Sequence, residues 1–243
     1  MTQDYNWQAG SKWIEPKELG SVLIIAPHQD DESLGCGGTI ALLRKSGQSV
    51  HVLFVTDGSK SHPSSREYPM EKLIALREQE SIRALDILGV DQSDITFLRL
   101  PDGALPGYEE EGFSSSVTLM SGCLQTVKPD TILFPWQRDP HRDHRATWQT
   151  TVEAVKQSGI RARKLEYLIW LWERADIADL PQPGEVRVWQ TNIESVKNTK
   201  KEAIHAHVSQ TTNLISDDPE GFTLSTDVLA HFDKNNEIFI ERI

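Results

Sequence analysis

The chain has 243 residues, which is enough for one domain with a full sheet and two helical layers. It carries 36 acidic and 25 basic side chains, and the net charge of −11 argues against binding to a nucleic-acid backbone unless a local basic patch overrides the average. The two cysteines, Cys36 and Cys123, form no Cys-x-x-Cys motif, which excludes a disulfide scaffold and a thiolate zinc finger.

The amino-terminal 16 residues are polar and lack the basic start and apolar core of a signal peptide. No stretch reaches the roughly 18 consecutive apolar residues that a membrane span needs. Together these features predict a soluble, cytoplasmic protein that has no membrane span and does not bind nucleic acid. They leave open whether the chain forms a homo-oligomer.

Apolar runs alternate with helical patterns along the chain, which is typical of a parallel sheet built from βαβ units. The predicted elements, in chain order, are strand 21–26, helix 37–46, strand 50–56, helix 73–88, strand 95–100, helix 115–127, strand 131–134, helix 143–157, strands 165–171 and 186–190, helix 193–207 and strand 237–243. This order predicts an α/β fold, a Rossmann-like three-layer αβα sandwich with a mostly parallel sheet. We expect a single domain over residues 1–243, with an N-terminal extension at 1–20 and a C-terminal accessory segment at 211–243.

Two polar clusters follow apolar runs of the predicted sheet. His28-Gln29-Asp30-Asp31-Glu32 comes directly after residues 22–26, and His141-Arg142-Asp143-His144 follows residues 131–134 through the bridge 135–140. The carboxyl ends of adjacent parallel strands open into one crevice, so both clusters can line the same site. Imidazole and carboxylate are ligands that zinc or ferrous iron accepts, and a catalytic site uses three of them beside an open position for water. The clusters therefore predict a metallohydrolase.

The same residues resemble the LmbE-like or PIG-L-like zinc-dependent N-deacetylases, whose hallmark is His-Pro-Asp-Asp-Glu after the first strand and a later His-x-x-His. Weaker agreement runs through residues 35–39, 56–58, 77–78, 102 and 206–210. Gln29 stands where the family has proline, which would fix φ and restrict the residue before it. His28 is therefore held less rigidly here, or a side-chain hydrogen bond from Gln29 holds it instead.

The resemblance implies that His28, Asp31 and His144 bind zinc, with ferrous iron as the alternative metal. It also implies that Asp30 is the general base. A positioned base of this kind contributes about 10² to 10⁴ in rate.

Four further roles follow from the resemblance. His141 becomes the electrophilic residue, which in protonated form contacts the oxyanion, and Asp143 is its orienting partner. Arg77 and Asp102 resemble residues that bind the substrate, Arg77 through polar groups and Asp102 through a sugar hydroxyl. Either Asp30 or His141 can protonate the leaving amine, and the sequence does not choose between them.

The implied reaction is hydrolysis of an N-acyl group, acetyl first among them, from a small-molecule amino sugar or its conjugate. N-acetylglucosamine-type sugars are the expected substrates. An amidase that acts on thiol conjugates is the close alternative, because the same site would cleave either amide.

Other interpretations stay open. Asp30, Asp31 and Glu32 can simply cap and open a helix, as can residues 141–144. Residues 34–38 resemble the glycine-rich loop of an S-adenosylmethionine- or nucleotide-binding enzyme, but they come several residues after the predicted strand end, so close packing of a helix on the sheet explains the glycines better. The third alternative is a metal-binding protein without turnover, and the non-ligand carboxylate of Asp30 argues against it.

Two loops flank the predicted site. Residues 59–69 contain serines and prolines with few apolar side chains, and residues 101–112 contain Asp102 and an acidic run. Both can shape substrate access, and both can equally be surface connections.

Overall fold

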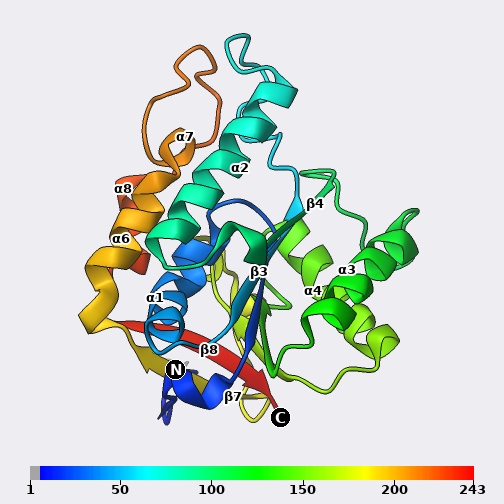
Figure 1. Cartoon of the computed structure of the whole chain (residues 1–243), viewed down its shortest axis with the longest axis vertical. Coiled ribbons are helices and arrows are strands. Elements are labelled where there is room, and N and C mark those ends of the chain that lie inside the picture. The colour runs from blue at the N-terminus through cyan, green and yellow to red at the C-terminus, as the bar shows by residue number, and fades with distance from the viewer. Residues whose placement is uncertain (1–5) are drawn as a thin grey trace.

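The computed structural model describes residues 6–243 (Figure 1), so the first five residues of the expected N-terminal extension lie outside the described residues. The described strands are β1 (Lys12–Trp13), β2 (Val22–Ala26), β3 (Val50–Thr56), β4 (Ile95–Leu100), β5 (Thr131–Pro135), β6 (Arg163–Tyr167), β7 (Val186–Asn192) and β8 (Asn236–Arg242). They form one sheet in the order β1-β7-β8-β6-β5-β2-β3-β4.

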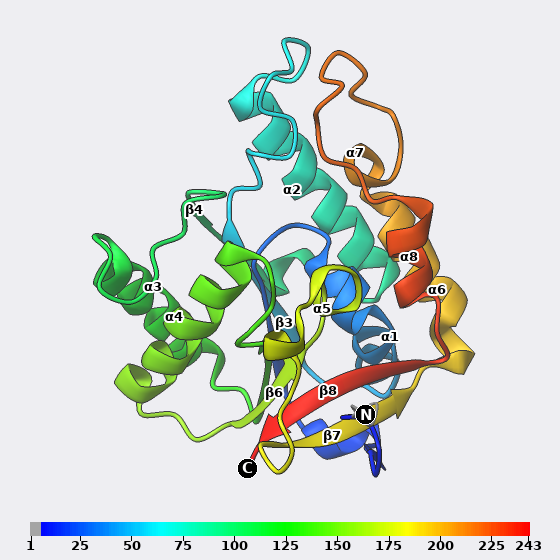
Figure 2. The ribbon, with the colours of Figure 1, turned by 180° about the vertical axis from the view of Figure 1, so that it is seen from behind.

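The sheet is mostly parallel, which confirms the predicted class. Strands β4, β3, β2, β5 and β6 pair in parallel with their neighbours, as do β1 and β7. Strand β8 runs antiparallel between β6 and β7. The expected C-terminal accessory segment therefore supplies a strand in the interior of the sheet, and Figure 2 shows β8 crossing the lower part of the molecule beside β7.

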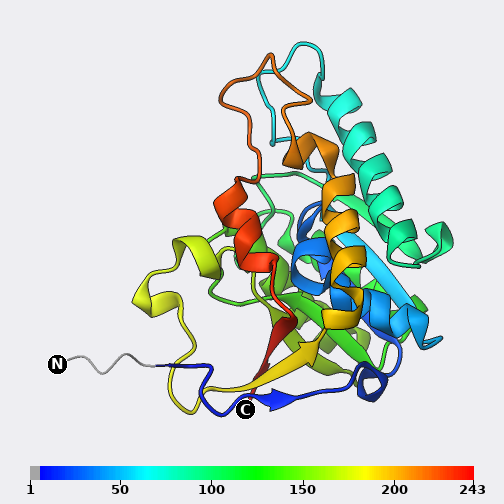
Figure 3. The same ribbon diagram turned by 90° about the vertical axis from the view of Figure 1, so that its left-hand side faces the viewer.

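Helices cover both faces of the sheet. They are α1 (Asp31–Lys45), α2 (Met70–Ile87), α3 (Phe113–Val127), α4 (Arg142–Ser158), α5 (Leu171–Arg174), α6 (Lys197–Ala206), α7 (Val208–Thr211) and α8 (Thr226–Phe232), with short 3₁₀ turns at Pro16–Leu19, Gln92–Asp94, Ile177–Asp179 and Glu194–Val196. Helices α1, α2 and α6 pack together on one face of the sheet, and α3 and α4 pack together on the opposite face (Figures 1 and 3).

Alternation along the strands divides the core between the two faces. Successive side chains of a strand point to opposite faces. Ile24 and Phe54 accordingly belong to the cluster beneath α1 and α2, whereas Leu23 and Leu53 belong to the cluster beneath α3 and α4. Burial on both faces explains why β2 and β3 read as continuous apolar runs.

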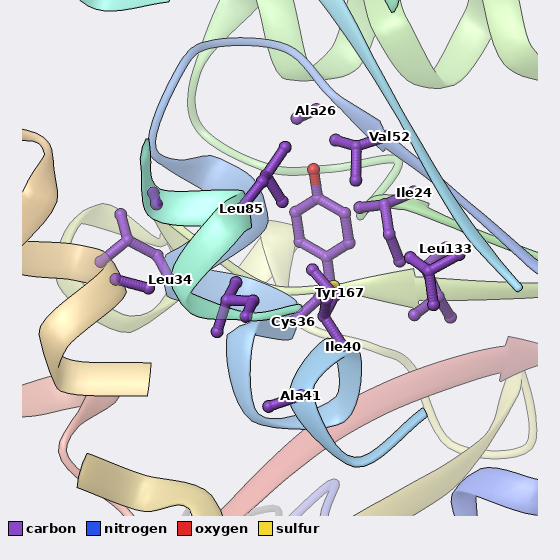
Figure 4. Close-up of a cluster of buried hydrophobic side chains, with 14 of the residues drawn as sticks. Ile24, Ala26, Leu34, Cys36, Ile40, Ala41, Val52, Leu85, Leu133 and Tyr167 are labelled. Atoms are coloured by element: carbon purple, nitrogen blue, oxygen red, sulfur yellow. The ribbon is translucent and has the colours of Figure 1, made fainter. Parts of the chain in front are cut away.

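Gly35 lets helix α1 approach the sheet closely. A Cβ atom at Gly35 would lie 2.6 Å from the Tyr167 ring, and Tyr167 donates a hydrogen bond from its hydroxyl to the Ile25 carbonyl at 2.9 Å. Figure 4 shows the ring surrounded by aliphatic side chains that include Ile24 and Leu85. This glycine therefore has the packing role that the sequence favoured over a nucleotide-binding loop.

Two predicted boundaries are wrong. Helix α1 begins at Asp31, six residues before the predicted start, so the acidic residues open the helix. Strand β6 ends at Tyr167 instead of Leu171, because residues 168–170 are buried without being in the strand and α5 then begins. Within residues 6–243 we find no helix of the length and hydrophobicity that crossing a bilayer requires.

Candidate metal centre and its cavity

The two polar clusters meet at the carboxyl ends of β2 and β5. These strands are parallel neighbours, with Ile24 opposite Leu133. The chain leaves β2 toward β3 on one side and reaches β5 on the other, so the clusters flank the point where strand order reverses. Open α/β sheets bind ligands at such a point.

His28, Asp31 and His144 converge at this point. The Asp31 carboxylate oxygen Oδ2 lies 3.3 Å from Nδ1 of His28 and 3.2 Å from Nε2 of His144. The same oxygen accepts the backbone N–H of His28 at 2.9 Å, which fixes the start of α1 against the end of β2. Asp31 therefore opens a helix and also faces both imidazoles, so the capping interpretation and the ligand interpretation are compatible.

His141 joins the same group. One ring nitrogen from each of His28, His141 and His144 lies within 4.8 Å of the others. A second candidate group, His28 with Asp102 and Asp143, satisfies the same distance. Two sets of potential metal ligands thus share His28.

The surroundings of His144 favour His28, Asp31 and His144 as the metal site. Backbone N–H groups donate to the carboxylates on both sides of His28: His28 itself to Asp31 at 2.9 Å, Lys60 to Asp102 at 2.7 Å and Gly103 to Asp143 at 2.7 Å. The ring of His144 is buried between two carboxylates, with Nε2 facing Asp31 at 3.2 Å and Nδ1 facing Asp139 at 3.4 Å, and neither contact has good hydrogen-bond geometry. A buried imidazole beside Asp31 without a well-formed hydrogen bond is an arrangement that a cation would complete.

Asp139 supports His144 from behind. Its Oδ1 atom lies 3.4 Å from His144 Nδ1 and accepts the backbone N–H of His141 at 2.9 Å, while Oδ2 accepts the backbone N–H of Trp170 at 3.0 Å. A carboxylate on the far nitrogen of a histidine ligand selects the tautomer that leaves Nε2 free for the metal. Sequence reasoning missed Asp139, although it lies in the bridge between β5 and the second cluster.

Asp30 adopts a strained backbone next to the presumed ligands. Its φ is 141°, a region that residues with a side chain rarely enter. Its N–H donates to Glu32 at 3.0 Å, and Glu32 in turn lies 2.9 Å from Nε2 of buried His207. Burial raises the pKa of Asp30 to about 7, against the opposing effect of Arg77, whose guanidinium lies 3.6 Å away. A carboxylate with that pKa suits proton transfer near neutral pH.

Gln29 and Arg77 hold the turn that carries Asp30. Gln29 donates from its side chain to the Thr56 carbonyl at 2.9 Å, which supplies the anchoring hydrogen bond expected in place of proline. Arg77 donates to the carbonyls of Gln29 at 2.7 Å and Gly58 at 3.0 Å. Gly58 is required here, because its φ is +68° and a Cβ would lie 2.2 Å from the Gln29 side chain.

The relation between His141 and Asp143 differs from the expected one. No hydrogen bond between the Asp143 carboxylate and the His141 ring is found within residues 6–243; the carboxylate lies 3.2 Å from His28 Nε2 instead. The backbone N–H of Asp143 donates to Nδ1 of His141 at 3.2 Å. Burial, together with His144 and His28, lowers the pKa of His141 to about 4. His141 is therefore neutral at neutral pH, with its proton on Nε2, so it is a neutral donor rather than the expected imidazolium.

The site opens into a cavity of about 210 Å³. Its floor contains His28, Asp30, Asp31 and His141, and both predicted substrate-binding residues, Arg77 and Asp102, line it. The remaining lining side chains are Leu34, Lys60, Ser61, Trp170, Arg174, Gln210, Phe222 and Leu224. Lys60 and Ser61 lie in the loop at 59–69 that the sequence placed beside the site, whereas Trp170, Arg174, Phe222 and Leu224 come from segments that it did not assign to the site. The expected C-terminal accessory segment thus forms part of the cavity wall.

Gln210 lines this cavity, and its amide has a fixed orientation. Ser209 donates its hydroxyl proton to Glu80 at 2.6 Å and can therefore only accept from Gln210 Nε2, at 2.9 Å. The Oε1 atom of Gln210 is buried and has no hydrogen-bond partner within residues 6–243.

The loop at 59–69 is tied to the C-terminal segment. Asp217 accepts from the Ser65 hydroxyl at 2.6 Å and from the Arg66 backbone at 2.7 Å, and Phe222 donates its N–H to the Ser61 carbonyl. Both segments lie at the top of the molecule in Figures 1 and 2. They position Ser61 and Phe222 together on the cavity wall.

Comparison with known proteins now identifies the family. Residues 23–155, more than half of the chain, match the family model described as PIG-L, GlcNAc-PI de-N-acetylase. The chain belongs to the PIG-L family. The matched residues include both polar clusters, and the resemblance predicted from those clusters is confirmed.

Relatives within and around the PIG-L family match over most of their length. The chain is 30% identical to a diacetylchitobiose deacetylase of Thermococcus kodakarensis, over 79% of this chain and 71% of that protein. It is also 30% identical to a probable N-acetyl-α-D-glucosaminyl L-malate deacetylase 2 of Bacillus subtilis, over 86% of this chain and 91% of that protein. The solved N,N′-diacetylchitobiose deacetylase of Pyrococcus horikoshii has the same fold, with a TM-score of 0.69 and 23% identity over 93% of this chain and 85% of that one.

Proposed function

We propose that this protein is a metal-dependent deacetylase that hydrolyses the N-acetyl group of an amino sugar or of its conjugate. Family membership and the activities named for the two relatives support this reaction class. The observation that carries the proposal is the convergence of His28, Asp31 and His144 beside the base candidate Asp30 at the floor of a cavity. The fold alone would not suffice, because one fold serves many reactions.

His28, Asp31 and His144 are the residues that would hold the metal. Two imidazoles and a carboxylate suit zinc, and ferrous iron accepts the same ligands. The fit rests on the position of one Asp31 oxygen between the two rings and on the buried His144 ring, whose nitrogens face carboxylates without well-formed hydrogen bonds. When bound, the metal supplies Lewis acidity, which makes water more acidic and polarises an acyl oxygen.

Asp30 takes the proton of the attacking water. Its carboxylate lines the cavity, its pKa of about 7 matches the working pH, and Arg77 and Glu32 hold it in place. His141 stabilises the negative charge that develops on the acyl oxygen. With Nδ1 occupied by the backbone N–H of Asp143, its Nε2–H is free to donate to the oxygen that becomes negative.

Asp30 also returns the proton to the leaving amine. The sequence left this step open between Asp30 and His141. A His141 pKa of about 4 leaves that ring without a second proton to give at neutral pH, whereas Asp30 carries the proton it took from water. The step therefore needs no further acid.

Amine release tests the proposal. Protein loaded with zinc, and separately with ferrous iron, is assayed on N,N′-diacetylchitobiose and on N-acetylglucosamine conjugates. Asp30→Asn is expected to keep its metal content and lose about 10² to 10⁴ in turnover. Asp227→Asn, an exposed carboxylate of α8, is the matched control and should leave turnover unchanged. Full activity in Asp30→Asn would remove the proposed base.

A further inference from the structure

Two cations at the cavity have no part in the reaction proposed above. Lys60 and Arg174 both line the cavity and are exposed. Within residues 6–243 neither forms an ion pair with a carboxylate. The third lining cation, Arg77, is different, because it is buried against Asp30 and two backbone carbonyls.

Arg174 is held in position by an aromatic wall. Its guanidinium carbon lies 4.2 Å from the centre of the Trp170 ring, and Trp170 packs edge-on against Phe222 at 5.7 Å. Stacking on an aromatic face leaves the N–H groups around the guanidinium edge free to bind an anion. A side chain that is already oriented loses less entropy when it binds.

Lys60 is anchored to the loop that carries Asp102. Its backbone N–H donates to the Asp102 carboxylate at 2.7 Å, and its Cγ atom lies 3.6 Å from the position a Cβ would take at Gly103. The start of the Lys60 side chain is therefore fixed beside the site, and its ammonium group has no carboxylate to neutralise it.

These cations matter because of the charge around them. The protein has a net charge of −11, and the cavity floor contains the carboxylates of Asp30, Asp31 and Asp102. The proposed metal ion would offset part of this charge at the reacting end, and Lys60 and Arg174 add positive charge elsewhere on the cavity wall, which would favour an anionic group there. A neutral sugar would need no such device.

We propose that Lys60 and Arg174 bind an anionic group, a carboxylate or a phosphate, on the part of the substrate that does not react. The inference rests on the proposed deacetylation and narrows its substrate to amino sugars conjugated to an acid. Of the two relatives compared above, one is named for a neutral disaccharide and the other for a malate conjugate. The two cations favour a substrate of the second kind.

A charge-matched pair of substrates tests the inference. N-acetylglucosaminyl malate and its dimethyl ester have the same reacting group and nearly the same shape but differ by two negative charges. We expect the wild-type protein to show a higher kcat/KM for the dianion, and added salt should reduce that advantage. N-acetylglucosamine 1-phosphate, compared with the methyl glycoside, distinguishes a phosphate preference from a carboxylate preference. Equal kcat/KM for charged and neutral substrates in both pairs would overturn the inference.

Variants locate the effect. Arg174→Gln and Lys60→Gln should each lower kcat/KM for the dianion by about 3- to 10-fold, through KM, and leave the ester unchanged. Lys45→Gln, which removes an equal charge from the far end of α1, is the control. Equal losses on acid and ester would contradict anion binding.

Binding separates this inference from the proposed function. Calorimetric titration of the same acid and ester onto the protein measures the preference without turnover. Tighter binding of the acid, lost in Arg174→Gln, supports the inference even if no amine is released, an outcome that would count against deacetylation alone. Equal affinities for the acid and the ester would contradict the inference whether or not amine is released.

Discussion

Two buried charged clusters contact helix α1, and their hydrogen bonding differs. In the interior of the fold, Glu237 accepts from the backbone N–H groups of Gly38 and Thr39, both at 2.8 Å, and from Lys200 at 2.7 Å. At the start of α1, Asp31 lies between two imidazoles, and the ring nitrogens of His144 face Asp31 and Asp139 without well-formed hydrogen bonds. We refer to these as the Glu237 cluster and the Asp31 cluster.

The comparison shows that burial of charge is not itself a sign of function. Lys200 and Glu237 are 3% and 4% exposed, as buried as the residues of the Asp31 cluster, yet protein groups complete their bonding. In the Asp31 cluster, the carboxylates and imidazoles can form more hydrogen bonds than they do. Bonding capacity left open inside a cavity identifies the cluster that a metal or a substrate completes.

The largest expected effect comes from removing a metal-binding side chain from the Asp31 cluster. His144→Ala should lose bound metal and reduce deacetylation about 10³-fold or more, because the metal contributes several kcal/mol to the reaction. Metal analysis and amine release on the same sample measure both losses. His205→Ala, on the exposed face of α6, should retain metal and activity. A fully active His144→Ala protein would contradict the assigned site.

Breaking the Glu237 cluster should instead destabilise the fold. Glu237→Leu leaves the Lys200 ammonium and two backbone N–H groups buried without partners, which should lower the free energy of unfolding by about 3 to 5 kcal/mol. Urea unfolding measures the loss, and the folded fraction should retain its kcat. Lys201 lies on the same helix as Lys200 and pairs with Asp233, which follows α8; Lys201→Met breaks this exposed pair and should cost less than about 1 kcal/mol. Similar costs for the two variants would invalidate the comparison.

Glu166 should have an effect of intermediate size, and its contribution to folding stability depends on pH. It is buried in β6 and accepts one N–H, from Gln137, and burial raises its pKa from 4.5 to about 7. Because the folded pKa is the higher one, the protonated carboxyl favours folding below pH 4.5, and that stability is lost as the pH rises through about 7. At pH 8 the loss approaches about 3 kcal/mol. Glu166→Gln should remove most of this pH dependence in unfolding measured at pH 5 and pH 8; an unchanged dependence would contradict it.

The smallest expected effect is on metal affinity alone. Asp139→Asn keeps an oxygen acceptor for only one of the two backbone N–H groups, those of His141 and Trp170, and removes the charge beside His144 Nδ1. Loss of such a supporting carboxylate should weaken metal binding about 10- to 100-fold. Competition with a chelator measures the affinity. An unchanged affinity would show that Asp139 only holds the backbone.

The sequence predicts the parts of this structure that depend on local patterns. Strand β2 is apolar throughout, and β3 is apolar except at His51 and Thr56, because both of their faces are largely buried. The clusters that follow β2 and β5 meet because these strands are parallel neighbours. The end of β6 could not be predicted in this way. Leu168, Ile169 and Trp170 continue the buried apolar run beyond the end of the strand, so hydrophobicity does not mark where the strand stops.

Contacts between distant segments are the other part that the sequence leaves undetermined. Glu32 meets His207, and Lys200 meets Glu237, with no spacing rule that relates the members of either pair. The family resemblance implies that Asp143 orients His141, whereas the Asp143 carboxylate lies 3.2 Å from Nε2 of His28. The sequence His-Val-Ser-Gln at 207–210 was part of the family resemblance, which pointed to a role near the site. Only the fold shows that Gln210 lines the cavity.

The most direct test of the account is anomalous scattering at the zinc absorption edge from crystals of active, zinc-loaded protein. The account predicts one strong peak within bonding distance of His28, Asp31 and His144, with Asp30 beside it and not coordinated. A peak bonded instead to Asp102 and Asp143, or no peak among these side chains, would contradict it.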